Sequence, residues 1–182
     1  REVMVTDQRA WITVEQVDVK EGLTWKRDPP REGRITLQFK LRNIGKTPAL
    51  SVWINAKLIA GLYTDSRIRE EMAQQARQRP LTFGFTQFPN QPAYHNHTLS
   101  LTDETIQAWG VAVGGRDPWA ERVPVPITVI GVVDYGLAFK GEKRQLQFAY
   151  QIELVGQPGI MAMGPGYGDM EPSQLAVRRS YF

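Results

Sequence analysis

The feature that most constrains this chain is a repeated alternation of apolar and polar residues with a period of two. Residues 35–41 carry it most clearly, because every second residue from Ile35 to Leu41 is apolar and those between are polar. Successive side chains of a β-strand point to opposite faces, so this spacing predicts a strand with one buried face. A chain built this way folds mainly as β-sheet. The spacing recurs over residues 50–58, 127–135 and 146–154.

Turn signals separate these segments and favour a sandwich. Gly45 can adopt positive φ, Pro48 can begin a strand, and Gly141 lies between the last two strands. Several short antiparallel strands with turns between them predict an immunoglobulin-like antiparallel β-sandwich. Residues 127–135 are apolar in both phases, which predicts a central strand covered on both faces. From their phases we expect one core that contains Leu37, Phe39, Val52, Ile54, Val133, Phe148 and Tyr150.

Less regular segments complete the strands. In the first segment Ile12 and Val14 keep one phase and Val17 keeps the other, so we expect a β-bulge near residues 15–16. Shorter strands are expected over residues 97–101 and 81–85.

Two helices are predicted outside this pattern. Over residues 66–79 apolar residues recur every four positions, and Pro80 follows as a stop signal. Over residues 102–109 Thr102 is the expected N-cap and Gly110 the expected end. Neither helix alternates with strands, so a parallel sheet is not expected.

These elements define one sandwich domain and a tail. The β-sandwich domain is expected over residues 1–156, with a helix-bearing insertion at about 61–96. Residues 157–182 form a Gly/Pro-rich tail, expected to be irregular unless something orders it. The tail also holds apolar residues around 160–163 and 175–182, so docking on its own sandwich, docking on a neighbouring subunit and a solvated end all remain open.

Composition excludes several classes of function. The chain has 182 residues, a net charge of +3 and no cysteine, which rules out thiol catalysis, disulfides and zinc sites with cysteine ligands. No apolar run has the roughly 18 residues that a membrane span needs. The basic clusters at 26–34 and 77–79 are short, and acidic residues interrupt the first, so strong nucleic-acid binding is not expected.

The two histidines are candidates for a metal site. His95 and His97 are two apart on an expected strand, so their imidazoles point the same way and could chelate a divalent cation. A protein site normally needs three or four ligands, and no further ligand is evident in the sequence. We therefore assign no metal residue, and we expect zinc or nickel to bind no tighter than micromolar.

No catalytic or cofactor-binding residue is assigned either. There is no G-x-S-x-G elbow to expose a serine nucleophile, and the glycine-rich run 164–168 lacks the strand and helix of a phosphate loop. Asp134 lies in a strand expected to be buried, where a backbone or arginine partner is expected. Trp25 is either a binding anchor or, the favoured interpretation, a lid on the sandwich. We expect core and rim positions for Trp11, Trp53, Trp109 and Trp119.

Three segments form a recognisable pattern, namely Arg9-Ala10-Trp11-Ile12, the turn 43–49 (Asn-Ile-Gly-Lys-Thr-Pro-Ala), and Gly131-Val132-Val133-Asp134-Tyr135. This pattern resembles that of a loose group of uncharacterised bacterial membrane-anchored proteins with one extracytoplasmic β-sandwich domain. The resemblance spans residues 9–152, and its most specific part is the turn. The segment 136–141, the absent cysteine near Ala149, the insertion and the tail depart from the group. The resemblance implies N-terminal membrane anchorage and an envelope location, and it implies no activity.

The leading hypothesis is a non-enzymatic binding or assembly module of a bacterial cell-envelope protein, on the periplasmic side of the membrane. A protein partner or self-association is expected, with the tail 157–182 as a candidate surface. Contact with a membrane is expected only through a segment before Arg1. The alternatives are a hydrolase-type enzyme with its site in the 61–96 insertion, and a weak polyanion-binding domain. Sandwiches carry many functions, so the fold does not choose among them.

Overall fold

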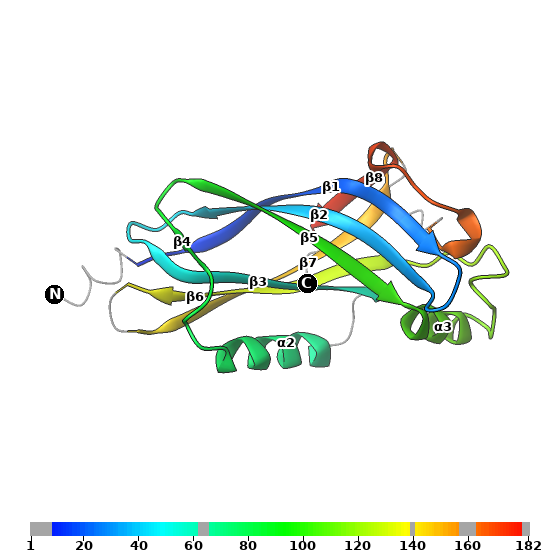
Figure 1. Ribbon diagram of the computed structural model, residues 1–182, viewed down its shortest axis with the longest axis horizontal. Helices are drawn as coiled ribbons and strands as arrows, with labels where there is room; N and C mark the ends of the chain where they lie inside the picture. Colours follow the sequence, from blue (N-terminus) through cyan, green and yellow to red (C-terminus); the bar gives the residue numbers. More distant parts are fainter. Residues whose placement is uncertain (1–8, 62–65, 139–140, 157–162, 180–182) are drawn as a thin grey trace.

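The computed structural model describes residues 9–61, 66–138, 141–156 and 163–179. Two antiparallel β-sheets pack face to face, with one helix against the outside of the larger sheet and another at one end (Figure 1). A mainly β, sandwich-like fold is thus confirmed. The helices are α2 (Ser66–Gln78) and α3 (Asp103–Ala112), and the short 3-10 turns are η1 (Pro165–Tyr167) and η2 (Pro172–Gln174).

The smaller sheet has three strands in the order β1-β2-β5. β1 bends away from regular pairing between Val14 and Gln16, which confirms the expected bulge. β5 is longer than the sequence predicts, because the polar residues before residue 97 also pair with β2. The bounds are β1 (Ile12–Lys26), β2 (Glu32–Asn43) and β5 (Pro92–Thr102).

The larger sheet has five strands in the order β4-β3-β6-β7-β8. The strand expected at 81–85 is displaced, since only Phe85 of that range belongs to β4. β4 and the first part of β5 both lie within 61–96, so this range supplies strands to both sheets as well as α2. The bounds are β3 (Ala49–Ala60), β4 (Phe85–Gln87), β6 (Ile127–Leu137), β7 (Lys143–Leu154) and β8 (Leu175–Arg179).

The core lies between the two sheets. Phe39 of β2 and Phe148 of β7 bring their ring centroids to 5.5 Å across it. Gly131 leaves the space for Phe148, because a Cβ at this position would lie 2.1 Å from the ring. All seven residues expected in the core are buried, namely Leu37, Phe39, Val52, Ile54, Val133, Phe148 and Tyr150.

β6 is buried along its whole length, as the sequence predicts for a central strand. Its inner face joins the main core. Its outer face lies under α2, where Ile130 and Val132 pack with Met72 and Ala76. The four-residue spacing of apolar residues in α2 therefore matches a real docking face.

The second helix differs from its expected end. Thr102 is the N-cap, since its side chain accepts a hydrogen bond from the Thr105 backbone N–H at 3.4 Å. The prediction that Gly110 ends the helix is wrong, because α3 continues to Ala112. Gly110 serves a close approach instead, since a Cβ there would lie 2.3 Å from the carbonyl oxygen of Arg116.

The described part of the tail is docked on its own sandwich. Residues 175–179 form β8, which pairs antiparallel with β7, and Met163 and Leu175 are buried. The expectation of an irregular tail is therefore wrong for this stretch. The edge of β7 supplies hydrogen-bond partners that the tail sequence could not supply alone.

Candidate functional site

The two histidines face the space between the sheets from β5. His95 stacks on Phe85 with 4.1 Å between ring centroids, and His97 meets Phe39 edge-on at 5.6 Å. Burial lowers the pKa of both imidazoles, and the neighbouring His97 lowers that of His95 further. The lowered pKa values favour neutral imidazoles, and both rings pack against aromatic side chains at the edge of the core.

A metal site does not emerge around these imidazoles. No group of three or more His, Asp or Glu side chains lies close enough to hold an ion within the described part of the chain. His95 Nε2 is buried and has no hydrogen-bond partner among the described atoms. The expectation that zinc and nickel bind weakly stays a prediction.

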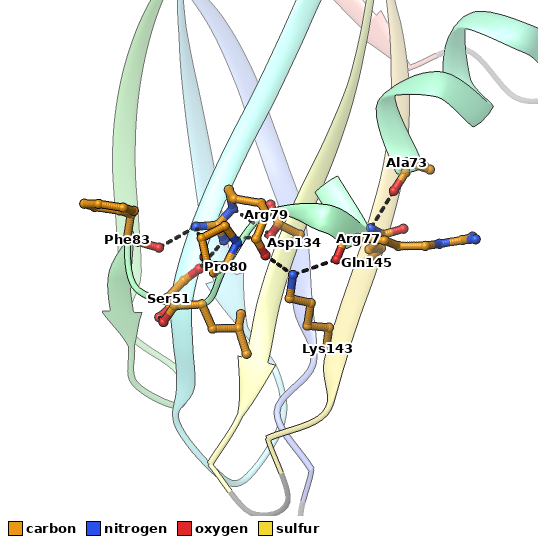
Figure 2. Close-up of polar contacts among 10 residues, drawn as sticks. Ser51, Ala73, Arg77, Arg79, Pro80, Phe83, Asp134, Lys143 and Gln145 are labelled. Carbon is orange, nitrogen blue, oxygen red and sulfur yellow. Dashed lines mark hydrogen bonds and ion pairs between the residues drawn. The ribbon is translucent and has the colours of Figure 1, made fainter. Parts of the chain in front are cut away.

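A buried ion pair joins the end of α2 to the large sheet (Figure 2). Asp134 of β6 is fully buried, and its Oδ2 accepts hydrogen bonds from Nε and Nη2 of Arg79 at 2.9 and 2.6 Å. The same guanidinium donates to the carbonyl oxygens of Ser51 and Phe83 at 2.9 and 2.6 Å. The expected arginine partner of Asp134 is thus present.

The last turn of α2 is also held from β7. Lys143 Nζ donates to the carbonyl oxygens of Arg77, at 2.8 Å, and Arg79 (Figure 2). Gln145 Nε2 donates to the carbonyl oxygen of Ala73 at 2.9 Å. Lys143 thereby satisfies a carbonyl group that the helix end leaves without a partner, and Gln145 adds a second bond further inside the helix. The polar cluster around Arg79 therefore fixes the helix in place, and its donors are already used.

The connection between β2 and β3 is organised by Asn43, which is fully buried. Its Oδ1 accepts from the backbone N–H groups of Trp11 and Gly45, both at 3.0 Å. Its Nδ2 donates to the carbonyl oxygens of Thr47 at 2.7 Å and Gln87 at 3.1 Å. One side chain thus joins the start of β1, the β2–β3 connection and β4.

Gly45 belongs to the same arrangement. A Cβ at this position would lie 2.0 Å from the carbonyl oxygen of Arg9, so only glycine allows the two segments to approach. The turn 43–49 is the most specific part of the resemblance. The need for Asn43 and Gly45 in this turn is explained by the close packing of the backbone around the Asn43 side chain.

We call this region the Asn43 end, defined by Trp11, Ile44 and Phe88 around Asn43. The three side chains come from the start of β1, the β2–β3 connection and the β4–β5 connection, which lie at one end of the molecule (Figure 1). Trp11 is 64% exposed, Ile44 57% and Phe88 51%. The expectation that Trp11 is a core or rim residue is wrong. Its phase opposite to Ile12 was the sequence signal for exposure.

The opposite end, which we call the α3 end, buries its tryptophans. Trp25 and Trp119 pack edge to face with centroids 6.0 Å apart, and both are buried. The indole N–H of Trp119 donates to Asp103 Oδ1 at 2.7 Å, and that of Trp109 donates to the carbonyl oxygen of Pro124 at 2.8 Å. Trp25 is a lid on the sandwich, as favoured from the sequence.

The basic stretches proposed for polyanions are engaged within the protein. Arg27 donates to the carbonyl oxygen of Pro165 at 2.7 Å, and Arg31 lies 5.6 Å from the Trp119 ring centroid. Arg34 pairs with Glu32 at 2.6 Å. Together with the buried pair of Arg79, these contacts occupy part of the hydrogen-bonding capacity of the basic stretches.

Comparison with known proteins gives no match, either among protein-family models or among curated proteins. Over the described residues, every helix is too short or too polar to cross a bilayer.

Proposed function

We propose that this chain is a non-enzymatic binding or assembly module of a bacterial cell-envelope protein, and that it binds through the Asn43 end. The observation that carries the proposal is the distribution of aromatic side chains. Among the described residues, five aromatic side chains have large exposure, and two of them, Trp11 and Phe88, lie together around Asn43. The other three are spread over the larger sheet, the smaller sheet and the connection between α2 and β4, namely Trp53, Tyr94 and Phe83. Exposed aromatic side chains collected on a rigid surface are typical of binding sites.

The rigidity of the Asn43 end supports a binding role. The backbone groups around Trp11, Ile44 and Phe88 are held by Asn43 and by the hydrogen bond from Ile44 N to Trp11 O at 2.8 Å. A preorganised surface loses less conformational entropy when it binds.

We also propose that the topology is immunoglobulin-like. The strand orders β1-β2-β5 and β4-β3-β6-β7 match the A-B-E and C′-C-F-G orders of that fold, with β8 as an added edge strand. In such sandwiches the loops at the strand ends carry recognition, which agrees with a site at the Asn43 end.

The enzyme alternative has less support. The best candidate for an active site is the polar cluster around Arg79 and Asp134, but its hydrogen-bond donors hold α2 in place. Among the described contacts, the cluster contains no serine paired with a histidine as nucleophile and base. The envelope location is supported by the resemblance over residues 9–152.

The proposal can be tested by photo-crosslinking in the bacterium that makes the protein. A photoreactive amino acid replaces Phe88 in the full-length protein, and a control variant carries it at Val111, which is 71% exposed at the α3 end. We expect a defined adduct, with a protein or with a lipid, from position 88 and none from position 111. Equal adducts from both positions, or none from either, would contradict the proposal. Separate fractionation of envelope and cytoplasm tests the location.

A further inference from the structure

We propose that the Asn43 end binds the surface of an anionic lipid bilayer, with Trp11, Ile44 and Phe88 among the headgroups and Arg9 and Lys46 beside the phosphates. This inference rests on the proposed function, because it names the partner of the same surface. It departs from the expectation that only a segment before Arg1 contacts a membrane. The argument has three parts, which concern the apolar side chains, the charges and the backbone.

The apolar side chains belong to backbone segments that meet around Asn43. They come from three separate connections of the chain that lie together at one end of the sandwich (Figure 1). Tryptophan and other aromatic side chains favour the boundary between headgroups and hydrocarbon, where an apolar ring and a polar edge are both accommodated. Trp11 fits this role, since 64% of it is exposed.

The charges beside them suit an anionic surface. Lys46 is exposed and is held next to Arg9 by a hydrogen bond from Lys46 N to Arg9 O at 3.3 Å. Neither cation forms an ion pair with a carboxylate of the described residues. Among the described acidic residues, Glu15 pairs with Lys40 at 3.1 Å, and Glu142 lies 3.6 Å from Arg144.

The backbone of this end carries little penalty for leaving water. An unpaired peptide group is costly to move out of water. Here Asn43 satisfies the N–H groups of Trp11 and Gly45 and the carbonyl of Thr47, and Asn90 N donates to Asn43 O at 2.8 Å. The turns can therefore enter a headgroup layer without leaving these polar groups unpaired.

The test is co-sedimentation of the 182-residue chain with lipid vesicles. One set of vesicles is phosphatidylcholine and the other is an equal mixture of phosphatidylcholine and phosphatidylglycerol. We expect binding to the anionic vesicles, and a loss of at least about tenfold in the variant Trp11→Ser/Ile44→Ser/Phe88→Ser, since each buried apolar side chain contributes to partitioning. The control Val111→Ser/Val113→Ser removes exposed apolar groups from the α3 end and should bind as the unchanged protein does.

Charge is tested separately. Arg9→Gln and Lys46→Gln should each weaken binding to the anionic vesicles about fivefold, in line with about 1 kcal/mol per cation near such a surface. Both effects should shrink when the ionic strength rises from about 0.1 M to about 1 M. Thermal unfolding of every variant checks that the fold is kept.

Three outcomes would overturn the inference. They are equal binding to both kinds of vesicle, binding unchanged in the triple variant, and no binding at all by the unchanged chain. If the last result came with a protein adduct from position 88 in cells, the lipid inference would fail while the proposed function would stand. With no adduct either, both would fail.

Discussion

The two ends of the sandwich differ in the exposure of their aromatic side chains. At the α3 end, Trp25 and Trp119 are buried against each other, and Trp119 gives its indole N–H to Asp103. At the Asn43 end, Trp11 and Phe88 stand in solvent around a buried amide. Burying a large ring stabilises a fold, the more so when its N–H has a partner as in Trp119, whereas leaving the ring exposed contributes little to folding.

The difference comes from what covers each end. The α3 end is covered by α3 and by the tail, where Asp169 Oδ1 accepts from the Trp25 backbone N–H at 2.7 Å. The Asn43 end is closed by tight turns, which satisfy their backbone through Asn43 but leave apolar side chains outside. The exposed aromatic side chains therefore differ between the two ends, although the α3 end also exposes the aliphatic side chains of Val111 and Val113.

The largest effect should come from the core that both ends share. Phe148→Ala removes a ring that packs on Phe39 and lies over Gly131, and we expect it to cost about 3–5 kcal/mol of unfolding free energy. Hydrogen exchange should rise at both ends together. Chemical denaturation measures the loss, and a variant as stable as the unchanged protein would remove Phe148 from the core.

Asn43→Ala should affect the Asn43 end alone. Four backbone groups lose their partner, and we expect a cost of roughly 2–4 kcal/mol, since unpaired buried groups are expensive. The matched control is Asn96→Ala on exposed β5, which should cost no more than about 0.5 kcal/mol. Exchange that increases equally at the α3 end would argue against two separately organised ends.

Truncation after Gly156 should affect the opposite end. It removes Met163, Leu175 and the pairing of β8 with β7, and we expect a loss of about 2 kcal/mol and a lower melting temperature. A chain that ends at Arg179 is the control. Light scattering should give the same number of subunits for both, and dissociation of an oligomer on truncation would mean that the tail also contacts a neighbouring subunit.

The smallest effect should be a pH dependence of the unfolding free energy that comes from His95 and His97 at the edge of the core. Burial lowers the pKa values of His95 and His97 in the folded protein, so the unfolded chain binds protons first as the pH falls. Their contribution to stability is complete above about pH 6.5 and is lost as the pH falls from there toward the lowered values. His95→Gln/His97→Gln leaves no histidine and should flatten this part of the profile. An unchanged slope would show that carboxylates determine it.

Alternation was enough to predict much of the fold. The core residues, the bulge after Val14, the central strand β6 and the docking face of α2 all follow from the period of apolar residues. Local signals failed where tertiary contacts decide. Gly110 is typical of a helix end, but here the glycine is required because a Cβ at this position would collide with the Arg116 carbonyl. Strand β8 depends on pairing with the open edge of β7.

The candidate site was harder to predict. Asn43 was recognised as part of a turn, but its four hydrogen bonds involve residues from Trp11 to Gln87, which no local pattern connects. The exposure of Trp11 could be read from its phase, whereas that of Phe88 could not, because it lies in an irregular connection. The sequence predicts an arginine as a possible partner of Asp134, but it does not indicate that this arginine is Arg79.

The order of the strands in the two sheets has a consequence for biosynthesis. The smaller sheet is complete once Thr102 has left the ribosome, but the larger one needs residues up to Arg179. At about 5–20 residues per second, the later strands follow seconds afterwards. During that time the inner face that carries Leu37 and Phe39 lacks β6 and β7, which supply much of the opposing core. Nascent chains are therefore most prone to aggregate between these two points, and slowing translation there should lower the soluble yield.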